Sequence, residues 1–255
     1  MTDASAARSG VIILGASSAI AEAVARRFAA QGARLGLVAR DHARLEAIAA
    51  DLKVRGAGAV AARAVDLAEP AQASMLEALA LEMGGADTVL IAYGLLGDQV
   101  EAEIDLAAAE RLLNVNFTSA ALWALAARQM LEAACGSAGL IVGLGSVAGD
   151  RGRKSNFVYG AAKGGFGLLL QGLAHRAALA GGPRAMVIKL GFVDTPMTAG
   201  FKKGGPLWSS PDQAAAAIVK AMARPRAIVY APWFWRWIIL VIRCLPEGLF
   251  NKANL

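Results

Sequence analysis

Short runs rich in Val, Ile and Leu alternate with longer amphipathic stretches along most of this chain. Such runs are typical of β-strands, and the stretches between them are long enough for helices. Parallel strands need long right-handed crossovers, so the alternation predicts an α/β fold, a doubly wound parallel sheet of about seven strands with helices on both faces. The predicted strands cover residues 11–14, 34–39, 59–65, 87–92, 138–144, 184–190 and 226–230.

The size of the chain favours a single domain over residues 1–255. It has 255 residues, of which 56% are hydrophobic, and this is enough for one sizeable core. We find no internal repeat and no linker rich in Pro, Gly or Ser. The least regular segment is 192–210, FVDTPMTAGFKKGGPLWSS, which predicts a mobile loop after the sixth strand. That loop follows the carboxyl end of a strand, where ligands bind in open α/β sheets.

The few cysteines and histidines argue against a metal site. Cys135 and Cys244 lie far apart without a second ligand nearby, and His42 and His175 are the only histidines. We expect reduced thiols and no metal. The first ten residues, MTDASAARSG, are polar and lack the layout of a secretory signal, so we expect a cytoplasmic protein.

The stretch LGASSAIAEA follows the first strand, where a dinucleotide-binding loop would lie. Such a loop carries glycine for a tight turn, for close approach of the pyrophosphate and for packing of helix on strand. Gly15 supplies the turn, but Ala19 and Ala21 stand at the other two positions. The helix N-terminus remains a site for phosphate, and Ser17 and Ser18 offer hydroxyl donors. The alternative is an ordinary helix N-cap.

Arg40 ends the second predicted strand, 25 residues after Gly15, close to the position that reads the adenosine ribose. A guanidinium there suits a 2′-phosphate, whereas an acid would bind a 2′-hydroxyl. The sequence therefore favours NADP(H). The adjacent Asp41 leaves NAD(H) open, and the alternative for Arg40 is a surface arginine at the start of a charged helix.

Tyr159 and Lys163, in YGAAK, lie four residues apart within a predicted helix over 156–180. Side chains at this spacing share one helix face, one turn apart. A phenol has a pKa of about 10. A neighbouring ammonium favours the phenolate, so we expect Lys163 to lower the pKa of Tyr159. The alternative is an amphipathic helix whose lysine extends to solvent.

Two further polar residues complete a candidate catalytic set. Ser146 ends the strand in GLIVGLGS, 13 residues before Tyr159, where its hydroxyl can hold a carbonyl oxygen. Asn116, in LLNVNFTSA, places an amide within an otherwise apolar helix, a position that burial and helix propensity disfavour. The alternative is a locally bonded asparagine, and Asn114 nearby leaves the choice between the two open.

These residues together resemble the short-chain dehydrogenase/reductase family, over about residues 11–230. The resemblance implies a Rossmann-like fold and a reductase or dehydrogenase that uses a nicotinamide cofactor. It implies that Tyr159 protonates the alkoxide, that Lys163 lowers the tyrosine pKa and binds the nicotinamide ribose, that Ser146 orients the carbonyl and that Asn116 organises a relay water. Through LGFVDTPM it also places Thr195 beside the carboxamide, and it places Asp66 beside the adenine. The cofactor-binding residues that it implies are Gly15, Ser17, Ser18, Ile20, Arg40, Asp66, Leu67, Tyr159, Lys163, Gly191, Val193 and Thr195.

The chain departs from the family pattern at four places. Ala19 and Ala21 replace glycines, IAYG at 91–94 stands where NNAG is usual, and Leu190 replaces the proline before Gly191. These departures bear on cofactor affinity more than on the chemistry.

A narrower resemblance is carried by AYGLLGD, RGRKSNFVYG and the tail APWFWRWIILVIRCLPEGLF. These segments are similar to decaprenylphosphoryl-2-keto-pentose reductases, which implies a keto-sugar carried on a polyprenyl phosphate as substrate. One alternative is a soluble oxidoreductase of another small lipophilic ketone or alcohol. The other is a nucleotide-binding protein of this fold that has lost turnover.

The C-terminal extension, residues 232–255, is apolar and basic. Residues 224–255 hold five Lys or Arg against one Glu, which accounts for four of the six net positive charges, and such local basicity argues against nucleic-acid binding. The stretch 233–245 has three tryptophans and is too short to span a bilayer, which needs about 20 residues. It predicts an interfacial helix, with Arg236 and Arg243 towards headgroups at the inner face of the membrane. The alternative is burial between subunits of a homo-oligomer.

Three cations, Arg151, Arg153 and Lys154, lie between Ser146 and Tyr159. We expect their loop to rim the pocket and to bind the phosphate of a lipid-linked substrate. The alternative is a solvated loop whose charges have no ligand.

Overall fold

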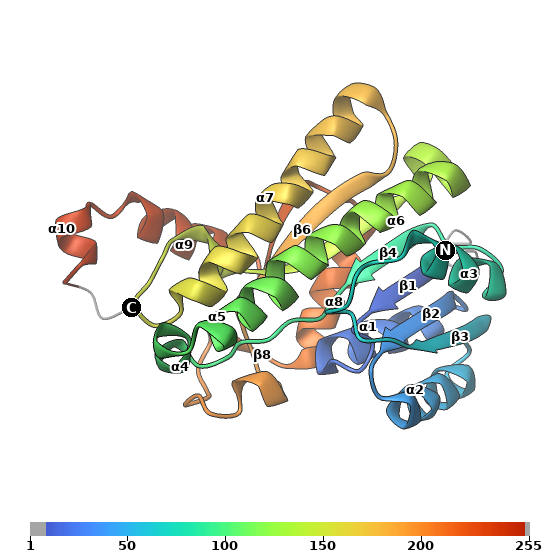
Figure 1. The fold of residues 1–255 in the computed structure, drawn as a ribbon, viewed down its shortest axis with the longest axis horizontal. Coiled ribbons are helices and arrows are strands. Elements are labelled where there is room, and N and C mark those ends of the chain that lie inside the picture. Colours follow the sequence, from blue (N-terminus) through green and yellow to red (C-terminus); the bar gives the residue numbers. More distant parts are fainter. Residues whose placement is uncertain (1–8, 253–255) are drawn as a thin grey trace.

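The computed structural model describes residues 9–252, which build a seven-stranded sheet with the strand order β3-β2-β1-β4-β5-β6-β9 (Figure 1). All six pairings are parallel, so the predicted doubly wound fold is confirmed. Each predicted strand is present, and its ends differ from the prediction by at most two residues. The strands are β1 (Gly10–Leu14), β2 (Arg34–Ala39), β3 (Ala59–Ala64), β4 (Thr88–Ile91), β5 (Leu140–Ser146), β6 (Arg184–Leu190) and β9 (Ile228–Ala231).

Helices cover both faces of the sheet because the buried strands present apolar side chains in both directions. In β1, Val11 and Ile13 join the core under α1, α2 and α8, whereas Ile12 and Leu14 join the core under α3, α6 and α7. The helices are α1 (Ala19–Ala29), α2 (His42–Val54), α3 (Ala73–Glu82), α4 (Gln99–Ile104), α5 (Leu106–Leu113), α6 (Ala120–Cys135), α7 (Phe157–Ala180), α8 (Pro211–Met222), α9 (Trp235–Cys244) and α10 (Glu247–Phe250).

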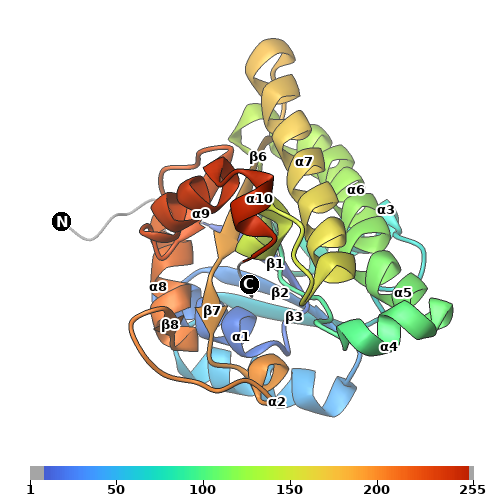
Figure 2. The same ribbon diagram turned by 90° about the vertical axis from the view of Figure 1, so that its left-hand side faces the viewer.

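The chain reverses its direction across the sheet at β1. It runs outward from β1 through β2 to β3 and then returns to β4, which pairs with the other side of β1. Ligands bind at such a reversal, outside the carboxyl ends of the strands. Figure 2 views this end of the molecule, with α4, the short strands β7 and β8, α9 and α10 in the foreground.

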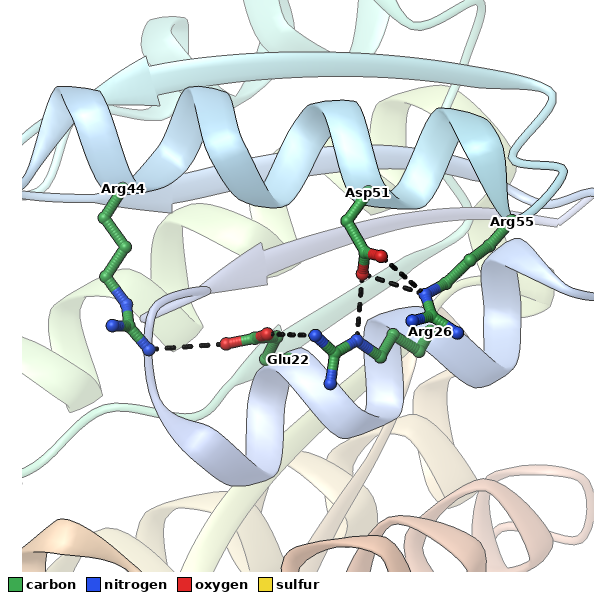
Figure 3. A network of polar contacts seen from close by, with 5 residues as sticks. All are labelled: Glu22, Arg26, Arg44, Asp51 and Arg55. Atoms are coloured by element: carbon green, nitrogen blue, oxygen red, sulfur yellow. Dashed lines mark hydrogen bonds and ion pairs between the residues drawn. The ribbon is translucent and has the colours of Figure 1, made fainter.

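A chain of charged side chains joins α1 to α2 beside this reversal (Figure 3). Arg26 binds Glu22 at 2.6 Å within α1 and Asp51 of α2 at 2.9 Å. Arg44, in the first turn of α2, reaches Glu22 at 3.4 Å. Hydrogen bonds from Arg55 and then Arg26 lower the pKa of Asp51. These contacts hold together the two helices that follow β1 and β2.

The segment 192–210 is more regular than its composition predicts. The strands β7 (Phe192–Val193) and β8 (Trp208–Ser209) pair in parallel, and the Asp194 amide donates to the Ser209 carbonyl at 2.9 Å. The Phe192 and Trp208 rings stack at 5.2 Å. The structure adds two short paired strands at the ends of this predicted loop, and an aromatic contact joins them.

The tail forms a helix, α9, that packs on the end of the sheet. Trp235 and Ile239 are buried against Val147, whereas Trp233 and Trp237 are exposed. Within residues 9–252, no helix combines the length and the apolar character that a membrane crossing requires. The position of α9 places the tail beside the segment that follows Ser146.

Candidate active site

The turn after β1 requires glycine at residue 15. Gly15 has a φ of +88°, and a Cβ there would lie 2.7 Å from Cβ of Tyr93. Its amide donates to the Val38 carbonyl at 2.8 Å, so the turn is fixed to β2 as well. The glycine thus lets the turn after β1 pack closely against Tyr93, which follows β4.

The hydroxyl of Ser18 is engaged within the protein. It accepts from the Ala21 amide at 3.2 Å as the N-cap of α1 and donates to the Ala92 carbonyl at 3.1 Å. Ser17 and Ile20 lie half-buried on the same turn. Ala21 is fully buried in the core, so its methyl group is accommodated on the protein side of the helix. The N-cap alternative thus describes Ser18, and the free amides of the first turn remain for phosphate.

The ends of β2 and β3 lie on one side of the turn after β1. Arg40 is exposed and borders a pocket of about 290 Å³ together with Leu95 and Arg111. The Asp41 carboxylate accepts the Arg44 amide at 3.0 Å and caps α2. This contact leaves Arg40 as the charged group that faces the pocket from the end of β2.

The turn after β3 carries Asp66 and Leu67. The Asp66 carboxylate accepts the Ala68 amide at 3.0 Å and lies exposed. Leu67 is buried, and its carbonyl accepts from the Trp123 indole at 3.0 Å and from the Ser119 hydroxyl. The turn is therefore tied to the helices that follow β4.

Asn116 lies in a π-helical turn, residues 114–119, between α5 and α6. The residue is fully buried, and its side-chain amide donates to the carbonyls of Leu95 at 2.7 Å and Leu112 at 3.0 Å. Its Oδ1 accepts the Leu95 amide at 3.1 Å. A wide turn of this kind is frequent at functional sites. The three hydrogen bonds of the Asn116 side chain explain how a buried amide is tolerated here.

Gly94 brings Asn116 next to Lys163. A Cβ on Gly94 would lie 2.6 Å from Asn116 Oδ1 and 3.1 Å from Lys163 Nζ. The loop after β4 thus passes between the two side chains and admits only glycine at this point.

Ser146, Tyr159 and Lys163 converge where β5 meets α7. The Ser146 hydroxyl lies near enough to the Tyr159 phenol to lower its pKa, and it accepts the Ala148 amide at 3.1 Å. Lys163 is buried one turn further along α7, and its Nζ donates to the Leu144 carbonyl at 3.2 Å. With Asn116 beside Lys163, the four predicted catalytic residues form one cluster.

The pKa of Tyr159 differs from the expectation. Burial of the phenol raises its pKa to about 12, and the hydrogen bond from Ser146 lowers it only in part. Burial also lowers the pKa of Lys163 to about 8. The expected net lowering of the tyrosine pKa is therefore wrong in this structure, because burial of the phenol outweighs its neighbours and Lys163 Nζ is bound to the Leu144 carbonyl.

Gly191, Val193 and Thr195 follow β6 at the same end of the sheet. Thr195 caps a short 3₁₀ turn, and its amide donates to the Thr198 hydroxyl at 3.1 Å. Val193 is buried. Gly191 lies directly under the Trp235 indole, because a Cβ there would fall 1.8 Å from Trp235 Nε1.

The basic loop does not act as one unit. Arg151 donates to the carbonyls of Ile242 and of Leu245, the latter at 2.8 Å, and its guanidinium lies 3.7 Å from the centre of the Phe250 ring. The prediction that Arg151 faces a substrate phosphate is therefore wrong, because this side chain caps the C-terminus of α9. Arg153 is half-buried, and burial lowers its pKa, whereas Lys154 is exposed.

Sequence reasoning missed a buried polar cluster beside the site. Lys189 of β6 forms an ion pair with Asp150, and both side chains are largely buried. The Tyr230 hydroxyl of β9 donates to the same carboxylate at 3.3 Å. The sequence does contain an indication of this cluster, since Lys189 is the one charged residue within the apolar run AMVIKL.

Comparison with known proteins agrees with this geometry. The sequence pattern of the family described as short chain dehydrogenase matches residues 9–204. An uncharacterised oxidoreductase of Mycobacterium tuberculosis is 36% identical over 95% of this chain and 96% of its own length. A putative ketoacyl reductase of the granaticin polyketide synthase from Streptomyces violaceoruber is 34% identical over 77% of this chain and 72% of its own.

A solved structure extends the likeness to three dimensions. A short-chain dehydrogenase from Sphingobium yanoikuyae, solved in complex with NADPH, has a TM-score of 0.77 and 29% identity, and the match covers 96% of both chains. The chain therefore belongs to the short-chain dehydrogenase/reductase family and is an NAD(P)-dependent oxidoreductase acting on CH–OH and C=O groups.

Proposed function

We propose that this chain is an NADPH-dependent reductase of a ketone in which Tyr159 donates the proton. The observation that carries the proposal is the cluster at the carboxyl end of β5, where Ser146 lies beside Tyr159 and Lys163 lies one helical turn away. Tyr159 is protonated throughout the neutral range, as a phenol also is at its ordinary pKa of about 10, so it carries the proton that ketone reduction consumes.

Each member of the cluster has a distinct task in this proposal. The Ser146 hydroxyl donates to the substrate carbonyl oxygen and orients it. When bound, the nicotinamide cofactor supplies a hydride to the carbonyl carbon. The Tyr159 proton moves to the developing alkoxide, and the Lys163 ammonium stabilises the phenolate that is left and binds the nicotinamide ribose. Asn116 holds the loop at Gly94 beside Lys163 and, as the family resemblance implies, organises the water that returns the proton.

The preference for NADPH rests on Arg40. It is exposed at the end of β2, while Asp41, the acid that would favour NAD, is held as the cap of α2. A guanidinium binds a phosphate through two parallel hydrogen bonds. The NADPH of the Sphingobium yanoikuyae relative is consistent with this preference. Gly15, Ser17 and Ile20 would line the pyrophosphate and nicotinamide side, Asp66 and Leu67 the adenine.

For the substrate we propose a keto-sugar carried on a polyprenyl phosphate. Besides the narrower sequence resemblance, the support is a half-buried cation, Arg153, on the loop between Ser146 and Tyr159. Burial lowers its pKa, as expected for a charge that has lost contact with water. A bound phosphate would compensate the Arg153 guanidinium for that lost hydration. Lys154 is exposed on the same loop and adds a second cation.

The tail would then contact the membrane that holds such a lipid. We treat residues 1–255 as one domain that includes this tail. Trp233, Trp237 and Val241 are 72%, 54% and 62% exposed, and Arg236 and Arg243 are exposed beside them. Aromatic and aliphatic groups flanked by cations fit the interface of an anionic bilayer. Flotation with vesicles of anionic phospholipid tests this contact, and Trp233→Ser with Trp237→Ser should abolish it.

A second copy of this chain would cover the outer face of α6 and α7. Leu122 and Leu125 of α6 and Leu168 of α7 are exposed there, and the two helices pack against each other. Exposed apolar side chains gathered in this way are typical of interfaces. Sedimentation of the wild type and of Leu168→Glu measures the oligomer, which the substitution should dissociate.

The substrate proposal is tested by following NADPH oxidation with two ketones, a polyprenyl-phosphoryl keto-pentose and a 3-ketoacyl thioester. Faster reduction of the keto-sugar supports the proposal. A preference for the thioester favours the second candidate, a reductase of acyl-chain ketones, for which the granaticin relative is the argument. NADPH binding without reduction of any ketone would indicate a silent nucleotide-binding protein.

A further inference from the structure

The first turn of α7, which carries Tyr159, is not capped by its own N-cap residue. That residue is Asn156, whose side chain makes no hydrogen bond to the helix and whose Oδ1 is buried without a partner among the residues that the structure describes. The first amides of a helix have no carbonyl partner within it, so a first turn without a cap opens more easily. The position of Tyr159 therefore depends on contacts from elsewhere in the fold.

Gln99 of α4 supplies one such contact. Its Oε1 accepts the Val158 amide at 3.2 Å, although the two residues are 59 positions apart in the sequence, and Val158 directly precedes Tyr159. Gln99 is half-buried, and its Nε2 donates to Oε1 of Glu103 at 3.1 Å within α4. The helix α4 packs against α7 and lies beside its N-terminal end (Figures 1 and 2). The cap on α7 thus comes from a separate helix, and Glu103 orients it.

The start of α4 is itself held firmly by the loop after β4. The Asp98 carboxylate caps α4. Gly97 has a φ of +66°, and a Cβ there would lie 2.7 Å from the Leu112 side chain, so the loop passes close over α5. Leu95 of the same loop is bound to Asn116 through both its amide and its carbonyl. The helix that caps α7 is therefore anchored to the loop that passes through the catalytic cluster.

We propose that Gln99 is a positioning residue, which keeps the first turn of α7 closed and so keeps the Tyr159 phenol beside Ser146. The inference rests on the proposed function, since it takes Tyr159 to be the proton donor. Proton transfer requires the donor within hydrogen-bond reach of the carbonyl oxygen. A turn that opens part of the time lowers the fraction of enzyme molecules that can react, so loss of this cap should lower kcat more than it raises KM.

The experiment replaces Gln99 by methionine, which has nearly the same length and lacks the acceptor oxygen. Gln213→Met is the matched control, because Gln213 Oε1 accepts the Ser210 amide at 2.8 Å and so caps a different helix, α8. The rescue is the double variant Gln99→Glu with Glu103→Gln, which exchanges the two side chains and preserves both hydrogen bonds. The measurements are kcat and KM for the ketone that the wild type reduces, the Kd of NADPH, the Tm, and hydrogen exchange of the peptide that contains Val158.

Gln99→Met should lower kcat by about 3- to 10-fold, as the loss of one helix cap predicts, with KM and the Kd of NADPH nearly unchanged. The amides in the first turn of α7 should exchange faster by a similar factor, because local opening exposes them to water. The double variant should restore both the kcat and the slower exchange. Gln213→Met should lower only the Tm.

Three results would overturn the inference. The first is a wild-type kcat in Gln99→Met. The second is an equal loss of kcat in Gln213→Met, which would indicate general destabilisation. The third is a folded double variant whose kcat stays as low as that of Gln99→Met, which would mean that the hydrogen bond to Val158 is not the cause.

Failure of the proposed function would look different. The wild type would then reduce no ketone, or Tyr159→Phe would reduce it at the wild-type rate. Hydrogen exchange needs no activity, so unchanged exchange at Val158 in Gln99→Met would overturn the capping role of Gln99 whatever reaction the enzyme performs.

Discussion

Arg151 donates a hydrogen bond of 2.8 Å to the carbonyl oxygen of Leu245, so a residue that follows Ser146 by five positions holds the C-terminal end of α9. The last carbonyls of a helix have no partner within it and attract cations. The loop between Ser146 and Tyr159 and the tail are therefore one structural unit, although 94 residues separate these two partners.

Arg151→Ala should release the tail without unfolding the sheet. It removes the bonds to the carbonyls of Ile242 and Leu245 and the contact with Phe250. Hydrogen bonds to a charged group are worth roughly 1.5–3 kcal/mol, so local opening should increase by about 10-fold or more. Limited trypsin digestion followed by mass spectrometry should show faster cleavage after Arg243. The control is Lys154→Ala, since Lys154 is exposed on the same loop. Equal cleavage of both variants would argue against the proposed role of Arg151 in holding the tail.

Tyr159→Phe should abolish most ketone reduction while the fold and NADPH binding persist. The substitution removes one hydroxyl and keeps the ring, and loss of a proton donor typically costs about 10²- to 10⁴-fold in rate. The measurement is kcat/KM from NADPH oxidation, with Tm as the check on folding. Tyr230→Phe removes another partly buried hydroxyl, the one that donates to Asp150, and should have a much smaller effect. Reduction by Tyr159→Phe at near the wild-type rate would eliminate this residue as the acid.

Lys163 should make the protein more stable as pH rises above neutrality. Burial lowers its folded pKa to about 8, whereas an unfolded lysine titrates at about 10.4. Between these values the unfolded state binds a proton that the folded state does not, so unfolding becomes less favourable as pH rises and this stability is lost as pH falls towards 8. The full effect is roughly 3 kcal/mol. Urea unfolding at about pH 8 and about pH 9.5 should show a smaller increase for Lys163→Met, and equal increases would contradict the lowered pKa.

Arg40→Ala should weaken NADPH binding by roughly 10-fold or more and leave NADH nearly unchanged, because the lost contact is a charged hydrogen bond to the 2′-phosphate. The measurement is the Kd of each cofactor by fluorescence titration. Arg44→Ala is the matched control, since Arg44 lies four residues further on, in the first turn of α2, but is paired with Glu22. Equal losses for both cofactors would place Arg40 elsewhere than at the phosphate.

Lys189→Met should destabilise the protein by about 3–5 kcal/mol, because it leaves the buried carboxylate of Asp150 without its counter-charge. Chemical denaturation measures the loss. The double variant with Asp150→Asn should recover part of it, since no buried charge then remains. A double variant less stable than Lys189→Met alone would show that another group stabilises the Asp150 carboxylate about as much as Lys189 does.

The sheet was predictable because its signal is local. Each buried strand is a short apolar run, and the lengths of the intervening segments dictate parallel crossovers, so all seven strands follow from the sequence. The positions of Ser146, Tyr159 and Lys163 follow as well, since two of them share a helix face and the third ends a strand.

Contacts between distant segments were not predictable in this way. The sequence alone suggests that Arg151 is a free cation, because its partners are backbone carbonyls more than 90 residues away. The raised pKa of Tyr159 depends on how deeply the phenol is buried, which spacing alone does not reveal. Pairing of Phe192 with Trp208 likewise joins two ends of a segment whose composition resembles a loop.

The π-helical turn at Asn116 constrains the number of residues in this part of the chain, and not only their identity. Each such turn holds one residue more than an α-turn, and one residue corresponds to roughly 100° of rotation about the helix axis. Removing a single residue from 114–119 would rewind the turn and rotate α6 against α5, which would carry Asn116 away from Leu95 and Trp123 away from Leu67. Along this helix, deletions should therefore be tolerated far less well than substitutions, and a difference of one residue between related chains marks where this turn has been gained or lost.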